Sequence, residues 1–429
     1  MLIKNFGQLS QTPERRVALE VVEAGLEAID PVNSIPRAVQ LAGNTLTVNG
    51  TPFDLAITER IFLLGFGKGS ARISKIIEAL LGDRLTAGTV IDVTPETFAK
   101  ISFTLGTHPL PSPTNLGFTA AALQLLSGLT ERDLVLVVIC GGGSALFEQP
   151  AEGVSLEQQI GLFRTLTERG ADIFELNTVR KHLSRVKGGQ LVQHLFPARV
   201  VSLVASDVPG NDLATIASGP TMPDMTTITD AQLVLQKYQV AESYALVETP
   251  KETKYFERVT NAIILSNRTA LEAMAARAQA FGYLATIHSD QLHGRTTAVT
   301  QLLLDQALLA AAINTTKGFI LLAGGETTVE VLGQGTGGRN QECALRALLQ
   351  LDGQTTFVAL DSDGWDNTSA AGAIVDANTL ARAQAQGLNP QQSLATSDSY
   401  TFFQAVGDAI MIDRLPSNVA DLFIVLRKL

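Results

Sequence analysis

Two short glycine-rich segments of the chain carry side chains that could hold or neutralise a phosphate. Lys68 lies within GFGKGS (65–70), and Ser144 follows three glycines in GGGS (141–144). A lysine among glycines at the start of a helix is well placed to neutralise a transferring phosphoryl group. The N–H groups of consecutive glycines at the end of a strand form a concave site for an anion. Both segments therefore indicate an anion-binding site.

The segment around Lys68 has features of two known phosphate-binding motifs but matches neither. A P-loop needs glycine at position 62, which is Phe62, and a hydroxyl residue at position 69, which is glycine. A dinucleotide fingerprint is closer, because Gly65 and Gly67 fit while Ser70 replaces the third glycine. Asp92 ends the next apolar run, where such a site has its ribose-binding acid. A nicotinamide-dinucleotide site therefore remains an alternative, although Lys68 favours phosphoryl transfer.

Ser144 has the surroundings of a hydrogen-bond donor and not those of a nucleophile. A nucleophile elbow needs glycine two residues after the serine, and Leu146 occupies that position. A catalytic triad would also need a histidine, and none has a telling spacing from Ser144. All five are interpreted as structural or solvated; they are His108, His182, His194, His288 and His293.

A basic segment, NTVRKHLSRVKGG (177–189), stands out in a chain whose net charge is −10. Asn177 is a suitable N-cap, and the two glycines that end the segment suit a helix stop. The segment thus predicts a helix that faces an anion. Its candidate substrate-binding residues are Arg180, Lys181 and Lys187.

Acidic residues follow several other apolar runs. Asp207 comes directly after ARVVSLVAS (198–206), where a carboxylate can hold Mg²⁺ through water beside nucleotide phosphates. Glu326 and Thr327 follow a second pair of glycines, and Arg339 follows a glycine-rich stretch at a predicted helix start. LDSDGWDN (360–367) adds Asp361, Asp363 and Asp366, which could bind a metal or shape a turn. Together these residues supply the cations and acids that phosphoryl transfer needs.

The elements that must position these residues follow one pattern. Runs such as IFLLGF (61–66), LVLVVIC (134–140) and FILLA (319–323) are continuously apolar and precede a polar loop and a helical stretch. Continuous apolar runs indicate strands covered on both faces, as in parallel sheets, and the helices between them supply the crossovers. The sequence therefore predicts an α/β fold. Ligands of such sheets bind beyond the carboxyl ends of the strands, where the unusual residues lie.

Composition bounds the class of protein. The chain has 429 residues, of which 45% are hydrophobic and 17% charged, so a compact fold of at least two domains is expected. The excess of acidic residues argues against binding to nucleic acid or to a membrane surface. Two cysteines, no apolar leader at the N-terminus and no membrane-length apolar run suit a cytoplasmic protein. The charged stretch 240–260 contains Pro250, and the predicted division is 1–250 and 251–429.

Taken in order, these segments resemble the glycerate 2-kinase family, whose C-terminal half is the domain called MOFRL. The segments are GFGKGS, THPLP, CGGGSALFEQP, LNTVRKHLSRVKGGQL, SDVPGNDLATIASGPTMPD, SNRTALEA, LAGGETTVEVLGQGTGGRNQE and SDGWDNTSAAGAIVD. The resemblance implies a Rossmann-like N-terminal domain, a smaller α/β C-terminal domain, and a site in the cleft between them. It implies transfer of the ATP γ-phosphate to the 2-hydroxyl of glycerate with Mg²⁺, and it maps the family's essential lysine and arginine to Lys68 and Arg339.

The resemblance and the residues together give one set of candidate sites. The remaining phosphate- or nucleotide-binding candidates are Gly65, Gly67, Gly141, Gly142, Gly143, Ser144, Ser206, Asn267, Glu326 and Thr327. Asp207 is the metal candidate, and the expected partners are a small hydroxy acid, a nucleotide and, as an option, a second copy of the chain. Three loops depart from the family pattern: HGRTT (293–297), DGWDNTS (363–369) and DRLPSNV (413–419). The alternatives are a hydroxypyruvate reductase that uses NAD(P)H and a diverged nucleotide-binding protein.

Overall fold

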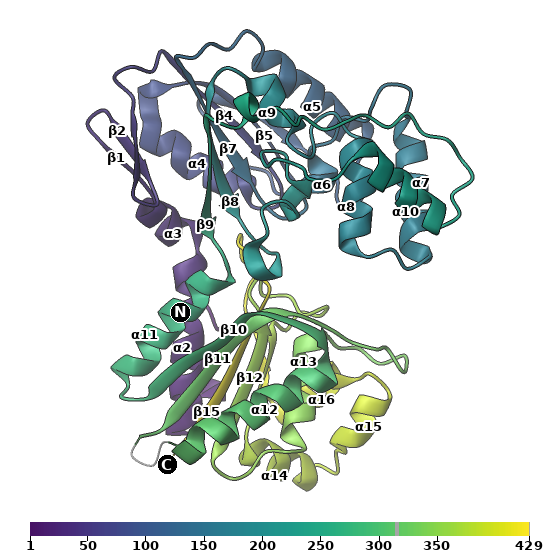
Figure 1. Ribbon diagram of the computed structural model, residues 1–429. Helices are drawn as coiled ribbons and strands as arrows, with labels where there is room; N and C mark the ends of the chain where they lie inside the picture. The colour runs from purple at the N-terminus through teal and green to yellow at the C-terminus, as the bar shows by residue number, and fades with distance from the viewer. Residues whose placement is uncertain (314–316, 429) are drawn as a thin grey trace. The chain divides into compact units, whose positions relative to one another are not determined.

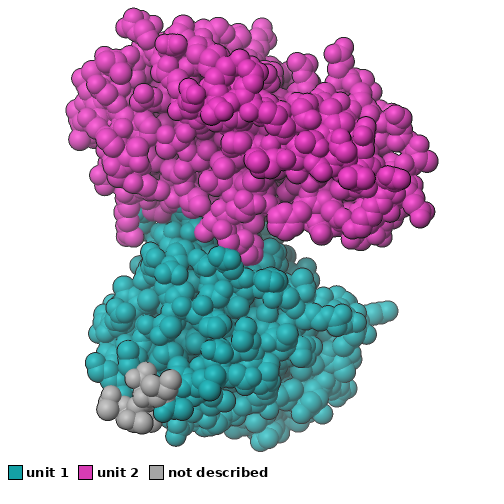
Figure 2. Space-filling model, in the orientation of Figure 1, with its two compact units in different colours: residues 1–33, 265–429 teal, residues 34–264 magenta. Residues whose placement is uncertain are grey.

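The computed structural model describes residues 1–313 and 317–428, which form two compact units. One unit comprises residues 34–264, and the other comprises residues 1–33 and 265–429 (Figure 2). Each unit is built on its own six-stranded sheet. Among the described residues, no helix has the length and apolar character that a membrane crossing requires.

The sheet of residues 34–264 has the strand order β6-β5-β4-β7-β8-β9. The pairs from β6 to β8 are parallel. Counted along the chain, this is the order 3-2-1-4-5-6 of a dinucleotide-binding fold, whose switch point lies between β4 and β7. The strands are β4 (Arg60–Phe66), β5 (Leu85–Asp92), β6 (Ile101–Leu105), β7 (Asp133–Ile139), β8 (Arg199–Ala205) and β9 (Val259–Leu265). Every residue of β7 is buried, as the unbroken apolar run 134–139 within it predicts.

Helices of this unit pack around the sheet and beside it (Figure 1). They are α4 (Ser70–Leu81), α5 (Pro113–Leu125), α6 (Gly143–Leu146), α7 (Leu156–Glu168), α8 (Ile173–His182), α9 (Gln190–Leu195) and α10 (Ile228–Lys237). Short 3₁₀ turns span Gly82–Arg84, Pro209–Asn211, Ile216–Ser218 and Thr253–Tyr255. Helices α7, α8 and α10 share a small apolar cluster of their own around Leu166 and Val179. A separate antiparallel sheet is formed by β1 (Val39–Ala42), β2 (Thr45–Val48) and β3 (Thr51–Asp54).

The sheet of the other unit is mixed, with the order β10-β11-β15-β12-β13-β14. Its first pair is parallel and the others are antiparallel. The strands are β10 (Leu284–Arg295), β11 (Phe319–Thr328), β12 (Thr355–Asp361), β13 (Gly372–Val375), β14 (Ala409–Ile410) and β15 (Asp421–Arg427). The helices are α1 (Phe6–Leu9), α2 (Pro13–Ile29), α11 (Asn267–Ala280), α12 (Thr296–Ile313), α13 (Arg339–Leu348), α14 (Ala377–Ala385), α15 (Pro390–Ala395) and α16 (Ser399–Val406), while α3 (Pro31–Ala38) contains the boundary between the units.

The division into units differs from the expected division at residue 250 in two ways. The boundary lies at residue 264, because the apolar run before Ser266 forms β9 of the first sheet. The first 33 residues belong with the C-terminal part, because α2 packs closely against α11: a Cβ on Gly25 would lie 2.7 Å from Met274. Arg15 of α2 is fully buried and pairs with Asp376 at 2.8 Å and with Asp408 at 2.7 Å. Asp376 and Asp408 lie 361 and 393 residues after Arg15, so the composition of the chain does not show that its first 33 residues belong to the C-terminal unit.

Candidate functional site

The loops that follow β4 and β7 lie side by side at the switch point of the first sheet. The Lys68 N–H donates to the Gly141 carbonyl at 2.8 Å, and the Cys140 N–H donates to the Phe66 carbonyl at 3.0 Å. Gly67 has a φ of +108°, and a Cβ there would lie 2.3 Å from the Cys140 carbonyl oxygen. Glycine is therefore required at position 67 by the close approach of the two loops. The lysine loop and the glycine-rich loop thus form one surface.

The first turn of α4 is closed by an acid of the chain. Asp92, at the end of β5, is fully buried and accepts the Ala71 N–H at 2.9 Å and the Val93 N–H at 2.6 Å. This contact corrects one expectation of the dinucleotide alternative. The Asp92 carboxylate is bound by the backbone of its own chain and is not presented to a ribose. Burial raises the pKa of Asp92, and the hydrogen bonds from the backbone oppose that shift.

His108 reaches the same surface from the loop after β6. Its Nε2 lies 2.9 Å from the place that a Cβ on Gly142 would occupy, and Lys68 Cε lies 3.4 Å from that place. Partial burial and then the positive charge of Lys68 lower the pKa of His108, so its imidazole is neutral at neutral pH. The sequence had suggested a structural or solvated role for this residue. The available signal was its place in THPLP, directly after a predicted strand.

Arg180 and Ser144 are joined by a chain of hydrogen bonds. The hydroxyls of Ser144 and Ser218 lie 2.9 Å apart, and the Ser218 hydroxyl donates to Asn177 Oδ1 at 2.9 Å. Arg180 Nη1 donates to the same Oδ1 at 2.8 Å. The guanidinium also lies 4.7 Å from the centre of the Phe163 ring. These contacts hold a cation close to the glycine-rich loop.

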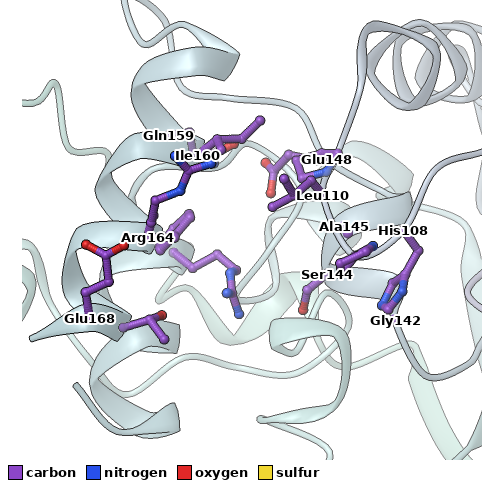
Figure 3. A pocket seen from close by; sticks show the side chains of 15 residues that line it. His108, Leu110, Gly142, Ser144, Ala145, Glu148, Gln159, Ile160, Arg164 and Glu168 are labelled. Atoms are coloured by element: carbon purple, nitrogen blue, oxygen red, sulfur yellow. The ribbon is translucent and has the colours of Figure 1, made fainter. Parts of the chain in front are cut away.

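A cavity of about 420 Å³ opens beside these groups (Figure 3). Figure 3 shows His108, Gly142 and Ser144 on one side of it, with Gln159, Arg164 and Glu168 of α7 on the other. Arg180, Glu148 and Phe163 also line this cavity. Glycerate has only seven non-hydrogen atoms, so the cavity has room for a small hydroxy acid. The wall of the cavity offers such an acid one cationic side chain, Arg180, and one imidazole, His108.

Asp207 is in contact with the glycine-rich loop at the end of β8. A Cβ on Gly141 would lie 2.0 Å from Asp207 Oδ2, so glycine is the only residue that fits beside this carboxylate. Ser206 hydrogen-bonds the backbone of Val208 at 3.3 Å and shapes the turn. Within the part of the chain that the structure describes, no three histidine, cysteine or acidic side chains gather as a metal site. Asp207 by itself suits Mg²⁺, which commonly binds one or two carboxylates and keeps waters and phosphates as its other ligands.

Arg339, in the other unit, lies among three carboxylates. Its guanidinium is 2.7 Å from Glu326, 3.1 Å from Asp361 and 2.9 Å from Asp421. Burial raises the pKa of Asp361 and of Asp421, and repulsion between the two raises that of Asp361 further. Thr327 is part of the same cluster, because its N–H donates to Asp421 at 3.2 Å. One cation and several acids are thus brought together from β11, α13, β12 and β15.

Comparison with known proteins identifies the family. Residues 17–249 match the family model described as "Domain of unknown function (DUF4147)", and residues 319–421 match the MOFRL family. The chain is 35% identical to the D-glycerate 2-kinase of Thermotoga maritima, over 96% of this chain and 97% of that protein. The chain belongs to the glycerate 2-kinase family. The glycerate 2-kinase of Picrophilus torridus is 34% identical, over 99% of both chains.

The fold predicted from the sequence is confirmed by a solved member of the glycerate 2-kinase family. The crystal structure of the Thermotoga maritima glycerate kinase has a TM-score of 0.86 to this chain at 34% identity. It covers 96% of this chain and 99% of its own. The resemblance of the sequence to this family, with its MOFRL domain, is likewise confirmed.

Two of the three basic residues expected to bind substrate are buried in this member of the glycerate 2-kinase family. Helix α8 begins at the N-cap Asp172 and ends at His182, so Lys187 is not on it and Asn177 is not its N-cap. Lys181 pairs with the buried Asp224 at 3.2 Å. Lys187 donates to the carbonyls of Gly143 and Phe147 and lies 3.9 Å from Glu148. Only Arg180 lines the cavity.

Two other residues that the sequence singled out hold backbone in place in this member of the glycerate 2-kinase family. Asn267 is buried, and its side-chain amide donates to the Val419 carbonyl at 2.8 Å and the Asp421 carbonyl at 3.0 Å. Asp366 accepts the N–H groups of Asn340 and Gln341 at 3.0 and 2.8 Å and so caps α13. These contacts give Asn267 and Asp366 a positioning role around Arg339, whose helix begins at that cap.

Lys187 should stabilise the glycine-rich loop through its hydrogen bonds to the Gly143 and Phe147 carbonyls. We expect Lys187→Met to lower the free energy of unfolding by about 3 kcal/mol, because it removes two hydrogen bonds and leaves Glu148 buried without its cation. Urea unfolding at pH 7.5 measures this, and Arg185→Met, an exposed residue of the same segment, is the control. An equal, small effect of the two variants would contradict the prediction.

The contribution of Lys187 to the free energy of unfolding changes with pH in a defined direction. Burial lowers the pKa of Lys187 to about 8, whereas an unfolded lysine has a pKa of about 10.4. Between these values the unfolded chain binds more protons than the folded chain, so Lys187 makes the free energy of unfolding rise with pH. Lys187→Met removes that rise. The measurement is the slope of the free energy of unfolding against pH, compared between wild type and Lys187→Met across pH 8–10.

Proposed function

We propose that the chain transfers the γ-phosphate of ATP to the 2-hydroxyl of glycerate, giving 2-phosphoglycerate and ADP. The observation that carries this proposal is the likeness to two glycerate 2-kinases over nearly the whole of both chains. The cavity beside Lys68 and the glycine-rich loop supports it, because its wall combines a cation, a hydroxyl and a neutral imidazole. Glycerate offers a carboxylate and hydroxyls to match these groups.

Several side chains in the cavity and on the loops beside it have proposed tasks. Lys68 neutralises charge that develops on the transferring phosphoryl group. Arg180 binds the carboxylate of glycerate, and Ser144 donates a hydrogen bond beside it. Asp207 holds Mg²⁺, whose charge offsets that of the phosphate oxygens when it is bound. The family resemblance implies that Arg339, in the other unit, is also essential to the reaction.

The reductase alternative loses its sequence support. It depended on Gly65, Gly67 and Asp92 as a dinucleotide fingerprint. A Cβ on Gly65 would lie 2.7 Å from the Ser74 hydroxyl, so packing of α4 on the sheet explains this glycine. Gly67 is explained by the approach of Cys140, and Asp92 is engaged by the first turn of α4. The fingerprint residues therefore have tasks within the fold.

One assay tests the proposal against both alternatives. Purified protein receives D-glycerate, ATP and Mg²⁺, ADP release is followed, and ³¹P NMR distinguishes the 2-phosphate from the 3-phosphate. A parallel sample receives hydroxypyruvate with NADH or NADPH, and loss of the reduced cofactor is followed. We expect ADP release and the 2-phosphate only. Oxidation of the cofactor without ADP release would overturn the kinase assignment in favour of the reductase. If neither reaction occurs but ATP still raises Tm, the result would favour a nucleotide-binding protein without activity.

A further inference from the structure

We propose that His108 accepts the proton of the glycerate 2-hydroxyl during phosphoryl transfer. This inference rests on the proposed function, and it supplies a group that the chemistry requires. A hydroxyl that attacks a phosphorus atom must lose its proton, and a neutral imidazole near the reacting oxygen is suited to take it. The proposal depends on where the fold places His108.

Lys68 and His108 converge on one backbone position from different strands. Both lie within 3.5 Å of the place of a Cβ on Gly142: Lys68 through Cε and His108 through Cδ2 and Nε2, at 2.8 and 2.9 Å. A phosphoryl group held by the Lys68 ammonium is therefore within reach of the His108 ring. His108 also lines the cavity that Arg180 lines, so the acceptor can contact both residues.

The other titratable groups of the cavity are less suited to this task. Glu148 is buried and lies 3.9 Å from Lys187. Glu168 and Arg164 lie on α7, across the cavity from His108 (Figure 3). Lys68 and Arg180 are cations and accept no proton. Partial burial, and then the positive charge of Lys68, lower the pKa of His108 and favour its neutral form, which is the form that can act as a base.

The proposed step balances in atoms and electrons. The 2-hydroxyl oxygen forms a bond to the γ-phosphorus, while the bond from that phosphorus to the oxygen bridging the β- and γ-phosphates breaks. ADP leaves with the electron pair of the broken bond. The hydroxyl proton passes to a ring nitrogen of His108, Nε2 being the one against Gly142. His108 is exposed to solvent, so the proton can then leave to water.

The test compares His108→Gln with wild type and with His194→Gln. His194 is an exposed histidine of the same unit whose ring bonds the Arg185 carbonyl at 3.1 Å, outside the cavity. We expect His108→Gln to lower kcat/KM for glycerate by about 10²- to 10⁴-fold, the usual contribution of a general base. The shift of Tm by ATP should stay unchanged. Wild type is expected to lose rate at acid pH as the base is protonated; that loss should be absent in the variant, and imidazole should restore rate to His108→Ala.

Each outcome decides the matter. If wild type releases no ADP with glycerate, the proposed function and the role of His108 fall together. If wild type is active and His108→Gln keeps its rate, the base is another group and the proposed function stands. A slow variant that keeps the loss of rate at acid pH and gains nothing from imidazole gives His108 a structural role only. A slow variant without that loss, restored by imidazole, supports the proposal.

Discussion

Replacing Lys68 with alanine is expected to lower kcat for glycerate phosphorylation about 10³-fold and to leave Tm unchanged. Lys68 is exposed, and its side chain lies over Gly142 beside the cavity. Its removal therefore costs no buried packing, while the developing charge of the phosphoryl group loses the cation proposed to neutralise it. Steady-state ADP release and thermal unfolding measure the two effects.

Lys254→Ala is the matched control for Lys68→Ala. Lys254 is also exposed, in the same unit, and it forms an ion pair with Glu252 at 2.5 Å. Exposed pairs of this kind contribute little to stability, so this variant should keep both kcat and Tm. Turnover retained by Lys68→Ala would remove Lys68 from the mechanism, whatever the control shows.

Replacing Arg339 with methionine is expected to affect both stability and rate. Asp421 is fully buried, and without the guanidinium it lacks the cation that lies 2.9 Å away. Loss of one partner of a buried pair typically costs about 3–5 kcal/mol. We expect a decrease of about 3 kcal/mol in the free energy of unfolding and at least a hundredfold decrease in kcat. Urea unfolding and ADP release are the measurements.

Arg346 offers a control on the same helix. It has the same exposed side-chain fraction as Arg339, 24%, but a single partner, Glu342 at 2.9 Å. Arg346→Met should keep kcat, although it leaves the buried Glu342 without its cation and is therefore expected to lower the free energy of unfolding as well. Arg339→Lys separates the two roles of Arg339, since it restores a positive charge but lacks the planar fork that contacts several carboxylates. Full kcat in Arg339→Lys would show that charge alone is sufficient.

Much of the fold was predictable because its signals are local. The continuous apolar runs before Gly141 and Ser206 specify buried strands wherever their partners lie. The N-terminal part of the second unit was not predictable in this way. Arg15 and Gly25 belong there through contacts with Asp376, Asp408 and Met274, and no local pattern records contacts over such separations.

The candidate site was predictable in its residue types and less so in its arrangement. His108 could not be assigned from spacing, because its position beside Gly142 depends on the strand order β6-β5-β4-β7. Lys187 has the sequence context of an exposed lysine and is buried by tertiary contacts. One local signal was available and missed: Asp172 and Glu175 have the spacing of a capping box, which places the start of α8 before Asn177.

The chain order of the two units has a consequence for synthesis on the ribosome. Helix α2 is made first, but its partner α11 is made only after all of residues 34–264. The apolar face of α2, including Leu19, Val22 and Leu26, therefore has no native cover while the whole Rossmann-like unit emerges and folds. Until α11 emerges, this face of α2 is exposed apolar surface of the kind that makes incompletely folded chains prone to aggregation.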